Sequence, residues 1–135
     1  MEKIKVTIWN EFRHEKTDEH ARALYPNGIH ATIGEFLSKD EEIEVRLAAL
    51  DDPEQGLPDS LLNDTDVLIW WGHMAHGEVK DELVTKIQRR VLLGRMSFIA
   101  LRSAHHSKPF RAILGTTGTL QWGRNQREIM WNLLP

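Results

Sequence analysis

Apolar positions along this chain follow a strand-like pattern in some segments and a helical spacing in others. Alternating or continuous apolar residues predict four β-strands, at residues 4–9, 42–47, 66–71 and 96–101. Apolar residues three and four apart predict three helices, at residues 28–38, 78–93 and 107–114. Weaker patterns predict helical turns near residues 19–24 and 57–62 and a further strand over residues 116–122. The polar stretches at residues 10–27 and 51–59 are expected to be loops.

The order of these elements predicts an α/β fold. The strand at residues 66–71 is a continuous apolar run, which is typical of a strand covered on both faces in a parallel sheet. Strands that alternate with helices favour a three-layer, doubly wound sheet. Right-handed crossovers in the common flavodoxin-like topology then give the strand order 2-1-3-4. The carboxyl ends of the first, third and fourth strands would therefore be neighbours, at the edge where such sheets bind ligands.

Composition excludes several classes of function. The chain has no cysteine, so a disulfide scaffold, a thiolate metal site and a cysteine nucleophile are excluded. A net charge of −3 gives no electrostatic signal for nucleic-acid binding. No apolar run is long enough to span a bilayer, and the N-terminus has no signal-peptide pattern. We therefore expect one cytoplasmic domain over residues 1–135, with neither nucleic acid nor a membrane as partner.

Histidines gather after the predicted strands. The chain has seven, and five of them follow strands that should be neighbours: His14 after the first, His73 and His76 after the third, and His105 and His106 after the fourth. The strands were assigned from apolar periodicity alone, so this coincidence is informative. It predicts that His14, His73, His76 and at least one of the last two converge in one pocket.

The histidines could simply be solvated loop residues without a chemical role. Two chemical interpretations of the cluster are also open. Zinc takes histidine nitrogens, and a catalytic zinc site needs three protein ligands and an open position. The spacing of His73 and His76, with His14 and His105 or His106, fits such a site. Alternatively, neutral imidazoles line a metal-free pocket for a sugar, with one histidine as general base.

Ser103 lies between a predicted strand and a helix, which is the context of a nucleophile elbow. The surrounding residues 101–105 lack the flanking glycines of such elbows, and a serine nucleophile needs an oriented base. We predict that Ser103 lies at a tight turn without such a base, as a polar turn residue or helix cap. The helix start near Ser107, beside Lys108 and Arg111, would suit a phosphate or carboxylate.

Three of the five tryptophans end predicted strands, namely Trp9, Trp70 and Trp71. Such residues are ordinarily core residues. An indole at the floor of a pocket can also stack on the face of a sugar ring.

Several long strings resemble the trehalose-utilisation (ThuA-like) family, and the match runs through nearly the whole chain. They are residues 6–14 (VTIWNEFRH), 25–30 (YPNGIH), 66–76 (DVLIWWGHMAH), 103–110 (SAHHSKPF) and 115–116 (GT). The resemblance implies a flavodoxin-like fold related to class I glutamine amidotransferases and a role in trehalose or related disaccharide metabolism, with 3-keto sugars as one idea for the substrate. In that superfamily the elbow holds a cysteine, and Ser103 stands at that position, so glutaminase chemistry is not expected.

Two departures from the family pattern matter. Relatives continue past residue 135, so we expect a C-terminally truncated chain with an incomplete sheet, whose unpaired edge favours a homo-oligomer. Arg102 stands where relatives tend to carry histidine, and a guanidinium is not a metal ligand at neutral pH.

The sequence thus predicts a carbohydrate-metabolism protein that binds a disaccharide or keto sugar, with zinc or another divalent metal as candidate cofactor. The competing class is a non-catalytic amidotransferase-like binding or assembly module. The candidate catalytic residues are Ser103, His105 and His106. The candidate substrate-binding residues are Asn10, Glu11, His14, Trp71 and Arg102. The candidate metal ligands are His14, His73, His76 and His106.

Overall fold

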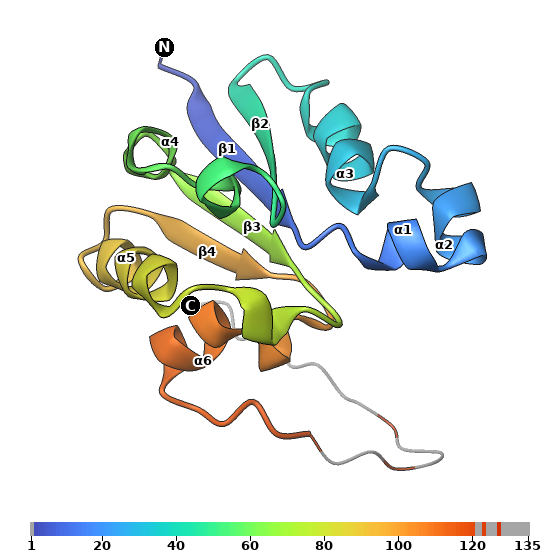
Figure 1. Cartoon of the computed structure of the whole chain (residues 1–135). Coiled ribbons are helices and arrows are strands. Elements are labelled where there is room, and N and C mark those ends of the chain that lie inside the picture. Colours follow the sequence, from blue (N-terminus) through green and yellow to red (C-terminus); the bar gives the residue numbers. More distant parts are fainter. Residues whose placement is uncertain (1, 121–122, 124–126, 128–135) are drawn as a thin grey trace.

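The computed structural model describes residues 2–120, 123 and 127. Its sheet is parallel and has the predicted strand order, β2-β1-β3-β4 (Figure 1). The strands are β1 (Ile4–Asn10), β2 (Ile43–Ala49), β3 (Val67–Trp71) and β4 (Ser97–Ala100). In register, Ile8 of β1 lies opposite Leu47 of β2 and Ile69 of β3. The α/β fold and its topology, both predicted from the hydrophobic pattern, are confirmed.

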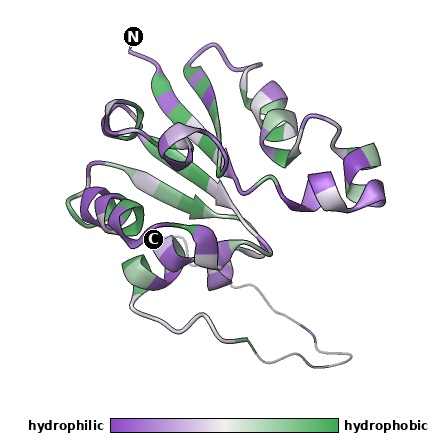
Figure 2. Cartoon of the chain, viewed as in Figure 1, coloured by the Kyte–Doolittle hydropathy of each residue, from purple (hydrophilic) through white to green (hydrophobic). Residues whose placement is uncertain are grey.

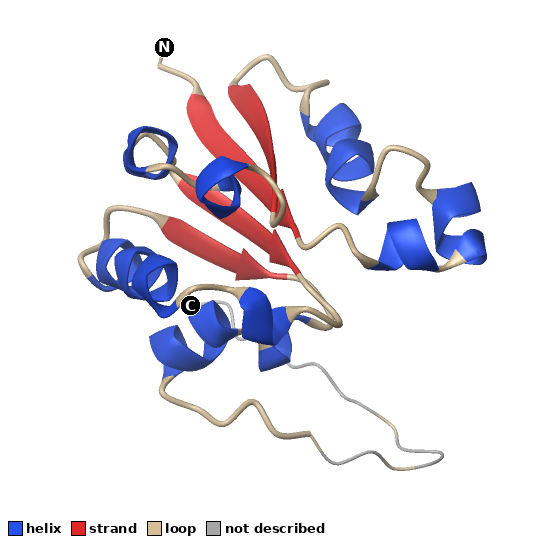
Figure 3. Cartoon of the chain, viewed as in Figure 1, coloured by secondary structure: helices blue, strands red, loops and turns tan. Residues whose placement is uncertain are grey.

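Helices lie between successive strands, and a further helix follows β4 (Figure 3). They are α1 (His14–Thr17), α2 (Glu19–Leu24), α3 (Ile29–Leu37), α4 (Asp59–Asn63), α5 (Asp81–Leu92) and α6 (Lys108–Leu114). Three short 3-10 turns are η1 (Pro53–Gly56), η2 (His76–Glu78) and η3 (Ala104–His106). Within the described part of the chain, no helix is long and apolar enough to cross a membrane.

Both faces of the sheet carry apolar cores, because successive side chains of a strand point to opposite faces. On one face the rings of Trp9 and Trp70 stack with centroids 3.6 Å apart, in a cluster that includes Ile87 of α5. On the other face Ile8 is fully buried and packs with Ile33 of α3. In Figure 2 the hydrophobic residues are concentrated along the strands. Trp9 and Trp70 are thus core residues.

The structure differs from the sequence expectation in two segments. The polar stretch at residues 10–27 holds two short helices as well as loop, and the second coincides with the predicted turn at residues 19–24. Asp18 starts that second helix, since its carboxylate accepts a hydrogen bond from the backbone N–H of Ala21 at 2.7 Å. Residues 116–120 form no strand, and residues 121–122 of the same prediction lie outside the described residues.

Candidate functional site at the carboxyl edge of the sheet

The loops after β1, β3 and β4 bring the five predicted imidazoles to one edge of the sheet. The ring centroids of His14 and His73 are 5.3 Å apart, and those of His76 and His106 are 6.3 Å apart. The ring of His105 lies 4.1 Å from that of His106. These distances form two groups, one around His73 and one around His106, on a rim made by three adjacent strand ends.

Trp71 ends β3 beside the first of these groups. Its ring centroid is 6.4 Å from that of His14 and 6.3 Å from that of His73, to which it is roughly parallel. The side chain is half-buried, unlike the fully buried Trp70 next to it. Strand alternation therefore turns one indole into the core and leaves its neighbour on the rim.

The turn after β4 places Ser103 against a histidine from the loop after β3. The hydroxyl Oγ of Ser103 lies 2.7 Å from Nδ1 of His73, which is hydrogen-bonding distance. The tight turn predicted at Ser103 is observed, and His73 is a base within hydrogen-bonding distance of its hydroxyl. The distance is within the reach needed between a nucleophile and its base. Among the described residues no carboxylate bonds to the other ring nitrogen of His73, so the pair is a dyad.

Glu11 fixes the loop that carries His73. Its carboxylate accepts hydrogen bonds from the backbone N–H groups of Met74 and Ala75, at 2.8 and 2.9 Å. The residue is only 1% exposed, and charge-assisted bonds to both oxygens offset the cost of burying the carboxylate. Sequence reasoning put Glu11 with the substrate-binding residues, whereas the structure places its oxygens against the protein's own backbone. Glu11 is thus a positioning residue.

Asn10 lies beneath the rim in a buried polar network. Its Nδ2 donates to the carboxylate of Glu15 at 2.7 Å and lies 3.0 Å from Nδ1 of His30. Its Oδ1 accepts from the backbone N–H of Phe12, and Glu15 also accepts from the N–H of Ile29. Asn10 was predicted to bind substrate, but it is fully buried and bonded to protein groups. The network joins the end of β1 to α1 and to the start of α3.

Two histidines of the second group have lowered pKa values. Burial lowers the pKa of His76, against the opposing effect of the nearby Glu11 carboxylate, and three neighbouring histidines lower it further. Burial also lowers the pKa of His105, with His106 and Arg102 adding to the effect. The side chains of His76 and His105 therefore favour the neutral imidazole, which is the form that accepts a proton or a hydrogen bond. Arg102 and His106 themselves are exposed.

The predicted metal set does not form a coordination site as the side chains stand. In the described residues no three histidine, aspartate or glutamate side chains are arranged to hold one ion. His14, His73, His76 and His106 lie in one region, but they belong to the two separate groups. Binding of zinc or another divalent ion stays a prediction, and it would require these rings to move.

The helix start near Ser107 serves the protein's own structure. Ser107 Oγ accepts from the backbone N–H of Phe110 at 3.3 Å, which caps α6. The ammonium group of Lys108 donates to the carbonyl of Val79 and to Asp81, at 2.7 and 2.8 Å. These contacts use Ser107 and Lys108, two of the three residues at which sequence reasoning placed a phosphate or carboxylate.

The structure is a parallel sheet with helices between its strands and a histidine-rich rim at its carboxyl edge. This arrangement places the protein in the class of parallel α/β proteins. More specifically, the chain belongs to the trehalose-utilisation (ThuA) family, whose model matches residues 5–131. This confirms the family resemblance seen in the sequence. A search of curated proteins finds no match to the chain.

The buried network predicts how stability depends on pH. Burial lowers the pKa of His30, although Glu15 acts in the opposite direction. The unfolded chain, with an ordinary histidine pKa of about 6.5, takes up the proton first. The stabilising effect of neutral His30 is therefore complete above that pH and is lost as the pH falls through the folded pKa. We expect urea unfolding to give a smaller free energy at low pH than at neutral pH, and a smaller difference in His30→Gln.

The matched control is His20→Gln, because His20 is an exposed histidine on α2. It should keep the pH dependence of the original chain. His76 and His105 also have lowered pKa values, so some dependence should remain in His30→Gln. A pH dependence that is identical in both variants would contradict this account of His30.

Proposed function

We propose that this protein binds a disaccharide or a keto sugar at the carboxyl edge of its sheet, as part of carbohydrate metabolism of the trehalose-utilisation kind. The observation that carries the proposal is the hydrogen-bonded pair of His73 and Ser103 beside the half-buried ring of Trp71. Membership of the trehalose-utilisation family supports the sugar as ligand class.

The chemistry of the rim suits a neutral, hydroxyl-rich ligand. A serine hydroxyl and a neutral imidazole each both donate and accept, so together they match the hydroxyls of a sugar. The face of an indole packs against the apolar face of a sugar ring, and Trp71 lies within 6.3 Å of the His73 ring, centroid to centroid. The lowered pKa values of His76 and His105 also favour an uncharged lining.

Calorimetry with trehalose and with its 3-keto derivative tests this proposal. We expect saturable binding of at least one of them, and a loss of about tenfold or more in affinity in Trp71→Ala and in His73→Ala, since each removes a main contact. The controls are Phe36→Ala and His20→Ala, which truncate an exposed aromatic residue and an exposed histidine elsewhere. No heat with either sugar from folded protein would contradict the proposal. Binding without turnover would favour the non-catalytic module over an enzyme.

The distance between Ser103 and His73 favours a second candidate function, an acyl hydrolase. In that reaction Oγ of Ser103 attacks an ester carbonyl while His73 takes the hydroxyl proton. His73 then gives the proton to the leaving alcohol as the ester C–O bond breaks. Water hydrolyses the acyl-serine and restores both side chains. The 2.7 Å contact supports this candidate, and the absence of a carboxylate partner for His73 among the described residues weighs against it.

Labelling with a fluorophosphonate tests the hydrolase candidate. If Ser103 is an activated nucleophile, it should label stoichiometrically, and His73→Ala should slow the labelling by roughly 100-fold or more through loss of the base. Ser97→Ala, which alters an exposed serine on β4, is the control and should label like the original chain. No label on Ser103 would rule out this candidate and leave the sugar-binding proposal in place.

A further inference from the structure

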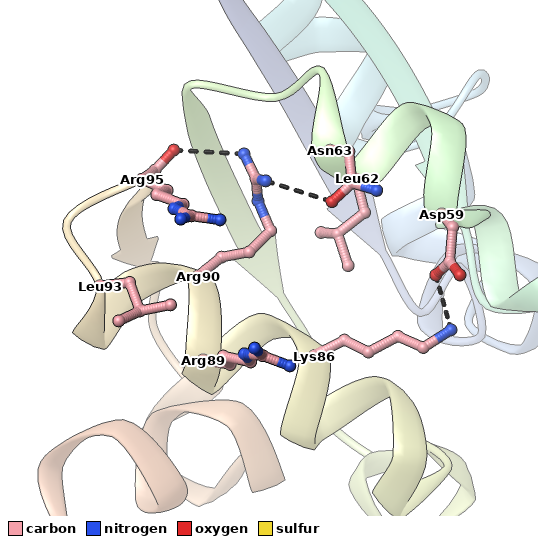
Figure 4. A pocket seen from close by; sticks show the side chains of 8 residues that line it. All are labelled: Asp59, Leu62, Asn63, Lys86, Arg89, Arg90, Leu93 and Arg95. Atoms are coloured by element: carbon pink, nitrogen blue, oxygen red, sulfur yellow. Dashed lines mark hydrogen bonds and ion pairs between the residues drawn. The ribbon is translucent and has the colours of Figure 1, made fainter.

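A cavity of about 330 Å³ lies at the opposite edge of the sheet from the histidines, and we call it the amino-edge cavity. It lies between the end of α4, the last turns of α5 and the residues that lead into β4 (Figure 4). Its polar lining residues are Asp59, Asn63, Lys86, Arg89, Arg90 and Arg95. Its volume falls within the usual range of small-molecule sites, from roughly 300 to 1,000 Å³.

Positive charge is concentrated in this cavity although the chain as a whole carries a net charge of −3. Four basic side chains line it, against the single carboxylate of Asp59. That carboxylate is paired with Lys86 at 2.6 Å. Neither Arg89 nor Arg95 forms an ion pair with any residue that the structure describes. The cavity therefore holds an excess of positive charge that its own residues do not neutralise.

Arg90 forms a fixed wall of the cavity. Its guanidinium donates to Oδ1 of Asn63, to the carbonyl of Thr65 and to the carbonyl of Arg95, at 3.2, 3.1 and 3.2 Å. These bonds join α5 to the segments that enter β3 and β4. Its Nε is buried and has no hydrogen-bond partner among the described residues. Arg90 is thus held in place by the protein itself.

The helix macrodipole explains only part of this arrangement. Basic residues in the last turn of a helix are favourable, and Arg89 and Arg90 occupy the last turn of α5. Arg95 lies beyond the helix, and the hollow between it and α4 is not a consequence of the dipole. The juxtaposition of these groups around a cavity therefore calls for a second explanation.

We propose that the amino-edge cavity binds the phosphate group of a small phosphorylated molecule. Arginine forks match phosphate oxygens in geometry and charge, and Arg89 and Arg95 supply two that form no ion pair with any residue that the structure describes. The cavity size limits the ligand to a small molecule. The site is separate from the histidine rim and independent of the sugar proposal, so the protein would have one polar site at each edge of its sheet.

Calorimetric titration with inorganic pyrophosphate at low salt tests the proposal. The double variant Arg89→Gln, Arg95→Gln should bind at least about tenfold more weakly, because charge-assisted hydrogen bonds are lost. The control is Lys3→Gln, Lys39→Gln, which removes the same formal charge from exposed positions outside the cavity. It should change the affinity by less than about twofold, since isolated surface charges contribute little. Thermal melts should show that both double variants stay folded.

Measuring pyrophosphate binding in rim variants distinguishes the amino-edge cavity from the histidine rim. Unchanged pyrophosphate binding in Trp71→Ala and His73→Ala would support two independent sites, even if neither sugar binds. No binding by the original chain, or an equal loss of affinity in both double variants, would overturn the proposal. An equal loss would indicate only a general attraction between the anion and surface cations.

Discussion

The buried carboxylate of Glu11 is the constraint on which the candidate site depends. It lies directly after β1 and bonds to two successive backbone N–H groups of the loop after β3. A carboxylate in that position is tolerated only while both oxygens have donors. Gly72 makes room for it, because a Cβ there would lie 3.3 Å from Oε2 of Glu11 and 3.2 Å from Nδ1 of His76. The two loops are therefore held at a fixed distance.

The hydrogen bonds of Glu11 also affect the position of the turn after β4. The loop that Glu11 holds presents His73, and His73 meets Ser103 in the turn after β4. Side chains on three strand ends are thus connected by hydrogen bonds, so the rim is positioned by the sheet and not by flexible loops. Such preorganisation is what recognition of a small polar ligand needs, because less ordering remains to be done upon binding. The buried network of Asn10, Glu15 and His30 supports the same edge from below.

Sequence reasoning predicted the parts of this structure that burial dictates. Apolar patterns such as the run at residues 66–71 and the helical spacing at residues 78–93 predicted the strands and helices. The alternation of these elements predicted the strand order and the edge where the histidines gather. The helix α1 was too short for periodicity to detect, whereas a weak pattern did predict a helical turn at residues 19–24, where α2 lies. The partners of Glu11 are backbone groups, which leave no signal in the sequence. The contact of His73 with Ser103 depends on side-chain direction across two loops. Likewise, Arg89 and Arg90 are typical of a solvated helix face until α4 closes a cavity around them.

Hydrogen exchange at the backbone N–H groups of Met74 and Ala75 tests the role of Glu11 most directly. The substitution Glu11→Gln keeps the size of the side chain but replaces one accepting oxygen with an amide that donates. Glu35→Gln, at an exposed position on α3, is the matched control. The account predicts faster exchange at one or both N–H groups in Glu11→Gln than in the original chain or the control, because local opening becomes easier. Equal protection in all three proteins would contradict the claim that this carboxylate holds the site together.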